Sequence, residues 1–88
     1  MYELAFEDEW ESRFDRLDKS VQIRVWKKVL QIKAGLPGRH LGKGAGYFVE
    51  EVGQYRIAYK SFDETNVRKF YFVGTHKEYM KWLGLEKA

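Results

Sequence analysis

The residues best suited to phosphate or acid–base chemistry are one arginine and one histidine, each beside a predicted turn or strand end. Arg56 comes directly after the Gly53-Gln54 turn, and a guanidinium can bind a phosphate through two parallel hydrogen bonds. His76 follows Gly74 at the end of a predicted strand, and an imidazole exchanges protons near neutral pH. A solvated surface arginine and a histidine that caps a strand are the plain structural alternatives. The residues alone leave both roles open.

The sequence contains neither a recognisable metal-binding motif nor a nucleotide-binding loop. His40 and His76 are the only histidines and the chain has no cysteine, so no set of transition-metal ligands is expected. The glycine-rich segment 42–46 lacks the Walker spacing, because Pro37 stands where the first glycine belongs and no Ser or Thr follows Lys43. We therefore expect no metal and no cofactor. A basic loop that meets phosphates through Arg39 and Lys43 is the better interpretation.

Acidic pairs and aromatic residues have simple structural explanations. Glu50-Glu51 and Asp63-Glu64 are typical of solvated strand and turn positions, and nothing in their spacing indicates a catalytic carboxylate pair. The many aromatic side chains after residue 46 could stack on bases. A small sheet domain needs such rings for its core, and that interpretation is favoured.

Length and composition predict one small domain that spans residues 1–88. The formal net charge of +3 permits a polyanionic partner without requiring one. No apolar run approaches the roughly 18 residues of a membrane span, and the N-terminus lacks the apolar stretch of a signal peptide. We expect no membrane association and a cytoplasmic location.

The elements that position Arg56 and His76 follow from hydrophobic periodicity. Alternation predicts strands over 2–6, 47–52, 55–62 and 67–73. Helical spacing predicts a first helix around Trp10, Phe14 and Leu17 and a second over 19–34, with Trp26 and Leu30 widening its apolar face. A short terminal helix or structured tail is expected over 75–83 and should stop at Gly84. The predicted fold class is α+β.

In this fold a small antiparallel sheet, made of the N-terminal strand and a three-stranded meander, carries an N-terminal αα-hairpin on one face. Strand alternation puts Arg56, Ala58 and Lys60 on one face of the sheet and Tyr55, Ile57 and Tyr59 on the other. The aromatic face should meet the helices, which leaves Arg56 on the open face or at its border.

The order of these elements resembles the RelE/ParE superfamily of type II toxins. The segment Val52–Tyr59 is similar to that family's hairpin motif, and Phe72–Tyr79 is similar to its C-terminal motif. The segment His40–Gly44 is similar to the family's approach to the second strand. The similarity extends over essentially the whole chain.

The resemblance implies a ribosome-dependent mRNA endonuclease that inhibits translation without a metal, by attack of the ribose 2′-OH on the adjacent phosphate. It implies a small RelB-like antitoxin as partner, in a toxin–antitoxin hetero-oligomer, besides the ribosome and mRNA. Arg56 matches the family arginine that stabilises the phosphate, and His76 and Lys77 match its basic C-terminal pair. Tyr79 stands near the family's terminal tyrosine, a place that Trp82 could equally occupy.

The chain departs from the family pattern on its second strand. Catalytic members carry basic residues there, whereas alternation puts Val49 and Glu51 on the face of Arg56. A carboxylate beside a scissile phosphate is unfavourable unless it acts as a general base. Otherwise Lys43, Lys60 or Arg68 must supply the positive charge.

Two other functions remain open in view of that departure. One is a ParE-like, non-enzymatic inhibitor of DNA gyrase, and the other is a degenerate member that only binds its antitoxin.

Overall fold

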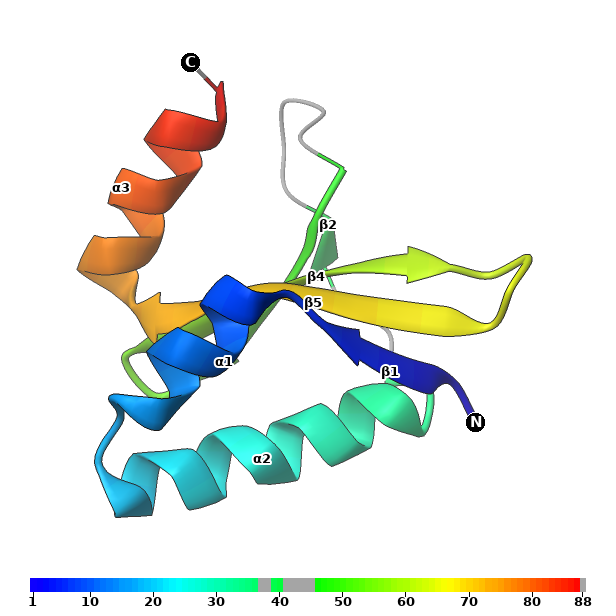
Figure 1. The fold of residues 1–88 in the computed structure, drawn as a ribbon, viewed down its shortest axis with the longest axis horizontal. Helices are drawn as coiled ribbons and strands as arrows, with labels where there is room; N and C mark the ends of the chain where they lie inside the picture. The colour runs from blue at the N-terminus through cyan, green and yellow to red at the C-terminus, as the bar shows by residue number, and fades with distance from the viewer. Residues whose placement is uncertain (37–38, 41–45, 88) are drawn as a thin grey trace.

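The computed structural model describes residues 1–36, 39–40 and 46–87, without the side chains of 39–40 and 85–87. Three helices and five strands follow one another along this part of the chain (Figure 1). In chain order they are β1 (Glu3–Phe6), α1 (Asp8–Asp15), α2 (Lys19–Lys33), β2 (Arg39–His40), β3 (Phe48–Val52), β4 (Tyr55–Phe62), β5 (Val67–Thr75) and α3 (His76–Lys87). The predicted α+β class is confirmed. No helix in the described ranges is long and apolar enough to cross a bilayer.

The strands form one sheet in the order β1-β5-β4-β3-β2. The meander from β3 to β5 is antiparallel, as expected, and the β3–β4 hairpin closes with Val52 paired to Tyr55. Gly53 between them has φ 58°, a conformation that glycine adopts without the steric penalty of a side chain. Asn66 at the β4–β5 turn has φ 59°, and asparagine is among the few other residues that tolerate this region.

The expectation of a wholly antiparallel sheet is wrong for the N-terminal strand. β1 lies parallel to β5, with Glu3 opposite Val67 and Phe6 opposite Phe70. The alternation of apolar residues in β1 shows which side chains are buried, but it carries no information on strand direction. β1 covers only the first half of β5, and α1 packs against β5 as well (Figure 1).

The main core lies between the sheet and the α1–α2 hairpin, as the sequence predicts. α2 contributes four buried residues to it, Val21, Val25, Val29 and Ile32. They pack with Ile57 and Tyr59 of β4 and with Phe70 of β5. Trp26 and Leu30, which were expected to widen this buried face, are instead 40% and 47% exposed.

The opposite face of the sheet is only partly open, because α3 packs on it. Tyr79 and Trp82 of α3 form a second buried cluster with Ala58 and Phe72 of the sheet and with Tyr47. α2 and α3 therefore lie on opposite sides of the sheet (Figure 1). The prediction that Gly84 ends the last helix is wrong, since α3 continues to Lys87.

Candidate functional site

Three segments meet at one end of the sheet: the β3–β4 turn, the end of β5 and the start of α3. Arg56 stands between Glu51 of β3 and Gly74 of β5 in the strand register. The backbone N–H of His76 donates a hydrogen bond of 2.8 Å to the Gln54 carbonyl in the turn. The fold thus brings Arg56 and His76 to the same end of the sheet, although they are distant in sequence.

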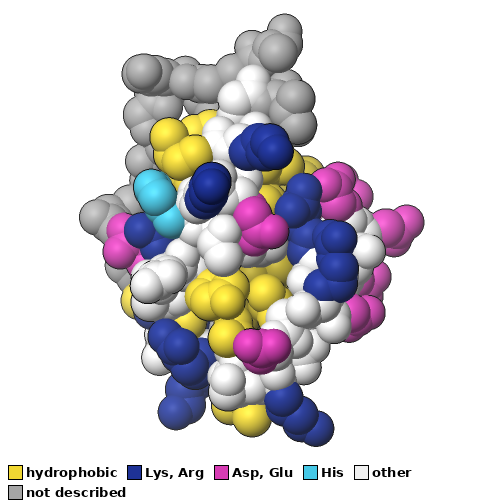
Figure 2. Space-filling model, turned by 90° about the vertical axis from the view of Figure 1, so that its left-hand side faces the viewer, with side chains coloured by type: hydrophobic (Ala, Val, Ile, Leu, Met, Phe, Trp, Pro, Cys, Tyr) yellow, Lys and Arg dark blue, Asp and Glu magenta, His cyan; other side chains and the backbone are white. Residues whose placement is uncertain are grey.

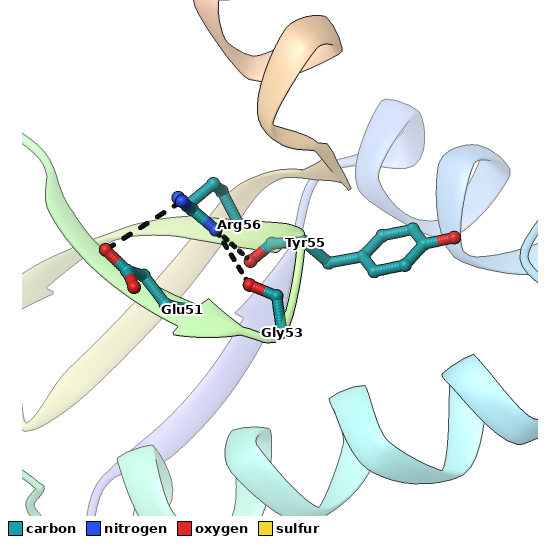
Figure 3. A network of polar contacts seen from close by, with 4 residues as sticks. All are labelled: Glu51, Gly53, Tyr55 and Arg56. Carbon is teal, nitrogen blue, oxygen red and sulfur yellow. Dashed lines mark hydrogen bonds and ion pairs between the residues drawn. The ribbon is translucent and has the colours of Figure 1, made fainter.

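The Arg56 guanidinium is held by backbone carbonyls (Figure 3). Its Nη1 donates to the carbonyls of Gly53 at 3.1 Å and Tyr55 at 3.0 Å. The side chain is 17% exposed, while the Tyr55 ring points to the opposite face (Figure 3). Neutral carbonyls fix the orientation of the guanidinium and leave its positive charge uncompensated.

Glu51 is the acidic neighbour of Arg56. Its Oε2 lies 3.9 Å from Arg56 Nη2, and its side chain is 50% exposed. An ion pair at that distance and exposure contributes little to stability, so a phosphate that carries full charge can compete with it. Val49 packs against the cluster beneath α3. β3 thus gives this face one acidic and one apolar side chain, as alternation predicted.

Tyr79 is a residue of α3 that packs against the sheet, and the positive charge of Arg56 acts on its hydroxyl. Only 5% of the residue is exposed, and its ring centroid is 5.8 Å from that of Phe72. Its hydroxyl is buried and has no hydrogen-bond partner in the described part of the chain. Burial raises the pKa of Tyr79, because it disfavours the phenolate, and the Arg56 charge opposes that shift. The hydroxyl is therefore a neutral donor on which the charge of the arginine acts.

His76 and Lys77 are the first two residues of α3, and both are exposed. Their position is fixed by a reciprocal pair at the helix start. Glu78 Oε1 accepts a hydrogen bond of 2.8 Å from the Thr75 N–H, and the Glu78 N–H donates to Thr75 Oγ1 at 3.2 Å. The backbone hydrogen bond from Thr75 lowers the pKa of Glu78. Thr75 and Glu78 have the spacing of a capping box, a signal in the sequence that our prediction overlooked.

Two of the four residues predicted to bind nucleic acid, Lys60 and Arg68, have described side chains, and these lie on opposite faces of the sheet. Lys60 is on the α3 side, where its Nζ is 4.7 Å from the Tyr47 ring centroid. Arg68 is only 7% exposed, and its Nη1 donates to the carbonyls of Ile32 at 3.0 Å and Leu36 at 2.8 Å. These bonds give Arg68 a structural role at the end of α2.

Two further predicted contacts come from the glycine-rich loop. Arg39 is placed only by its backbone, which pairs with Val49. Lys43 lies outside the described residues.

Two arginines that the sequence analysis did not single out also lie at this end of the sheet. Arg13 is in the last turn of α1, and Arg16 directly follows that helix. Arg13 lies over the Phe72 ring at 4.7 Å and bonds to Glu9 at 2.8 Å. Arg13 and Arg16 line a hollow of about 290 Å³ with Glu78 and other residues at the ends of β4 and β5. Figure 2 shows an apolar surface on this side of the molecule, with basic and acidic side chains around it. No local pattern predicts this arrangement, because it depends on α1 packing against β5.

No metal centre is formed in the described ranges, where no three His, Cys, Asp or Glu side chains gather in a suitable group. The available chemistry is that of a fixed guanidinium, a buried phenol and an imidazole at the start of a helix.

Comparison with known proteins finds similar structures but no similar sequence. No family model matches the sequence, and no curated protein sequence matches it. Solved structures do match. The RelE chain of the Escherichia coli RelBE toxin–antitoxin complex is 20% identical with a TM-score of 0.77, over 85% of this chain and 96% of that one.

Two further matches come from other organisms. The RelBE2 toxin–antitoxin complex of Mycobacterium tuberculosis gives 22% identity and a TM-score of 0.72, over 85% of this chain and 98% of that one. The RelB–RelE complex of Methanococcus jannaschii gives 14% identity and a TM-score of 0.71, over 89% and 96%. The chain has the fold of RelE toxins.

Proposed function

We propose that this chain is the toxin of a type II toxin–antitoxin pair and cleaves mRNA on the ribosome without a metal. Its likeness to RelE chains over nearly their whole length supports the toxin assignment. The observation that carries the catalytic part is the Arg56 guanidinium, which backbone carbonyls orient on the α3 side of the sheet. There its charge acts on the buried Tyr79 hydroxyl.

The proposed reaction breaks one phosphodiester bond. The ribose 2′-oxygen attacks the adjacent phosphorus, the bond to the 5′-oxygen breaks, and the products carry a 2′,3′-cyclic phosphate and a 5′-hydroxyl. One group must accept the 2′ proton and another must protonate the leaving oxygen. Cations and hydrogen-bond donors must stabilise the charge that develops on the phosphorane.

The residues around Arg56 have the types that this reaction needs. Arg56 would hold the phosphate and stabilise the phosphorane, and the Tyr79 hydroxyl would be a further, neutral donor. His76 would move a proton, since an imidazole can both accept and donate one. Lys77 follows it at the start of α3 and would add positive charge near the RNA backbone.

Glu51 has a restraining role in this proposal. A carboxylate 3.9 Å from the Arg56 guanidinium competes with the substrate phosphate for that cation. Binding of RNA then requires the exposed Glu51 side chain to turn away from Arg56. Were Glu51 instead the acceptor of the 2′ proton, its removal would abolish cleavage rather than strengthen binding.

A RelB-like antitoxin is the proposed partner. The solved structures with this fold include RelBE complexes from a bacterium and an archaeon, and we propose that this chain forms a similar hetero-oligomer. Because its proposed target is the translating ribosome, it would act in the cytoplasm.

One observation favours a second function, the inhibition of DNA gyrase without catalysis. Val49 and Glu51 give the Arg56 face less positive charge than binding to a phosphate backbone favours. An inhibitor that binds a protein target has no need of that charge.

Inducible expression in a heterologous host separates the two functions. We expect growth arrest with codon-phased cuts in coding regions when mRNA 5′ ends are mapped. Intact mRNA with broken DNA would replace the proposal with gyrase inhibition, and unimpaired growth from soluble, folded protein would contradict both.

A matched pair of variants tests the role of Arg56. Arg56→Ala should abolish the cuts while the melting temperature stays within a few degrees of wild type. Lys27→Ala is the control, because Lys27 is an exposed basic residue of α2, on the side of the sheet opposite α3 and outside the proposed site. It removes the same charge and should leave cleavage unchanged. Equal loss in both variants would show that net charge, and not Arg56, carries the activity.

A further inference from the structure

An exposed apolar stripe runs along the outer side of α2. Ile23, Trp26 and Leu30 follow one another at helical spacing and are 62%, 40% and 47% exposed. They are three of the six large hydrophobic residues that are exposed in the described ranges. Single exposed apolar residues are ordinary, whereas a contiguous stripe on one helix marks an interaction surface.

The stripe adjoins an aromatic hollow between α1 and α2. Phe6, Trp10, Phe14 and Trp26 line this space of about 200 Å³. The Trp26 ring lies 6.0 Å from Phe6 and 6.1 Å from Phe14 between centroids. The hollow and the stripe together form the hairpin groove, which continues from β1 over Trp26 to the outer side of α2.

The two sides of the hairpin groove carry opposite charges. Glu11 and Asp15 of α1 line the hollow on one side. On the other side, Arg24 and Lys27 lie next to the stripe on the flank of α2 that faces away from α1, and both are exposed. The sequence of α2 holds five basic residues and no acidic one.

We propose that the hairpin groove binds a second copy of this chain in a two-fold symmetric dimer. A rotation of 180° about an axis along the groove places the acidic side of each copy opposite the basic side of the other. The apolar stripe and the aromatic hollow then face their own counterparts, as an isologous contact requires. The surface is therefore complementary to itself in charge and in polarity.

Charge also argues against a nucleic acid as the occupant. Glu11 and Asp15 would repel a phosphate backbone along the whole α1 side. The groove lies on the side of the sheet opposite α3 and Arg56 (Figure 1). The dimer thus leaves the proposed catalytic face uncovered. The proposal of a dimer is therefore independent of the proposed function.

Analytical ultracentrifugation of the purified chain tests the proposal. The average mass should rise with concentration from 10.5 kDa to twice that value, and added salt should weaken the association because it screens the charged sides. Leu30→Gln should shift the transition to at least about tenfold higher concentration. Met80→Gln is the control, because Met80 is an equally exposed apolar residue on α3, and it should change nothing.

A charge exchange tests the arrangement itself. The double variant Glu11→Lys/Asp15→Lys has two basic sides, and Arg24→Glu/Lys27→Glu has two acidic sides. Each alone should remain monomeric, and a mixture of the two should form a heterodimer at twice the monomer mass. A wild-type chain that stays monomeric at the highest attainable concentration would overturn the proposal. So would charge variants that self-associate as wild type does, or a mixture that stays monomeric while wild type dimerises.

Discussion

Replacing Tyr79 with Phe should make the protein more stable and less active at once. The Tyr79 hydroxyl is buried and has no partner among the residues that the structure describes. A buried polar group without a hydrogen bond destabilises the folded state by about 1–3 kcal/mol. Phenylalanine keeps the ring contacts with Phe72 and Trp82 and removes only the oxygen. Folding therefore does not require this hydroxyl, and the influence of the Arg56 charge on it makes it a candidate donor in the proposed reaction.

The size of the effect follows from that penalty. Removal of the hydroxyl should raise the free energy of unfolding by about 1 kcal/mol, at the low end of the range because the group leaves a small void. In a domain of this size such a gain raises the melting temperature by about 4–8 °C. The buried hydroxyl meets a phosphate only when binding of RNA uncovers it, and loss of that donor should lower the cleavage rate by about 10²-fold.

Tyr59 provides a matched control on the other side of the sheet. Its hydroxyl is also buried without a partner among the described residues, but it lies in the core under α2. Tyr59→Phe should stabilise the protein similarly and leave cleavage unchanged. Urea unfolding and single-turnover cleavage on programmed ribosomes measure the two quantities for both variants.

The two tyrosines also predict the stability of the protein at alkaline pH. Burial raises the pKa of each above its ordinary value, so the unfolded chain loses these protons first. Their contribution is complete below about pH 10 and is lost as the pH rises through the folded-state pKa values. In each Phe variant the free energy of unfolding should fall less steeply as the pH rises than it does in wild type.

Destabilisation by Tyr79→Phe, or equal loss of cleavage in both variants, would refute the functional role of the Tyr79 hydroxyl.

Three further substitutions test neighbouring residues. Glu51→Gln should tighten RNA binding and keep cleavage, because it removes the charge that competes for Arg56; a loss of about 10²-fold in rate would instead identify Glu51 as a proton acceptor. His76→Gln should remove one limb of the pH–rate profile while binding to the ribosome persists, and an unchanged profile would exclude proton transfer by His76. Arg68→Met should lower the free energy of unfolding by about 1–3 kcal/mol in urea titrations, since two carbonyls at the end of α2 lose their donor; Lys69→Met, at the neighbouring and more exposed position, should have little effect.

Much of the fold could be predicted because its signals are local. The hairpin around Gly53 and the alternation of β4 need only turn chemistry and a period of two residues. The path of β1 beside β5 and the packing of α3 on the second face depend on contacts between distant segments. The apolar stripe of α2 shows the same limit, since Trp26 has the spacing of a core residue but is 40% exposed. Periodicity marks an apolar face without saying whether this chain or another one covers it.

A single irregularity in β5 determines which arginines can act together. Ala58 pairs with Phe72 and Tyr59 pairs with Phe70, so Tyr71 is an extra residue in β5. This bulge puts Phe70 in the core under α2 and Phe72 in the cluster under α3. Without it, strict alternation would place Arg68 on the face of Phe72, which is also the face of Arg56. With it, Arg68 turns toward the carbonyls at the end of α2. A bulge of one residue leaves no mark in the apolar pattern here, so the sequence could not show that Arg68 is structural. The proposed catalytic face therefore relies on Arg56 to a greater extent than the count of basic residues suggests.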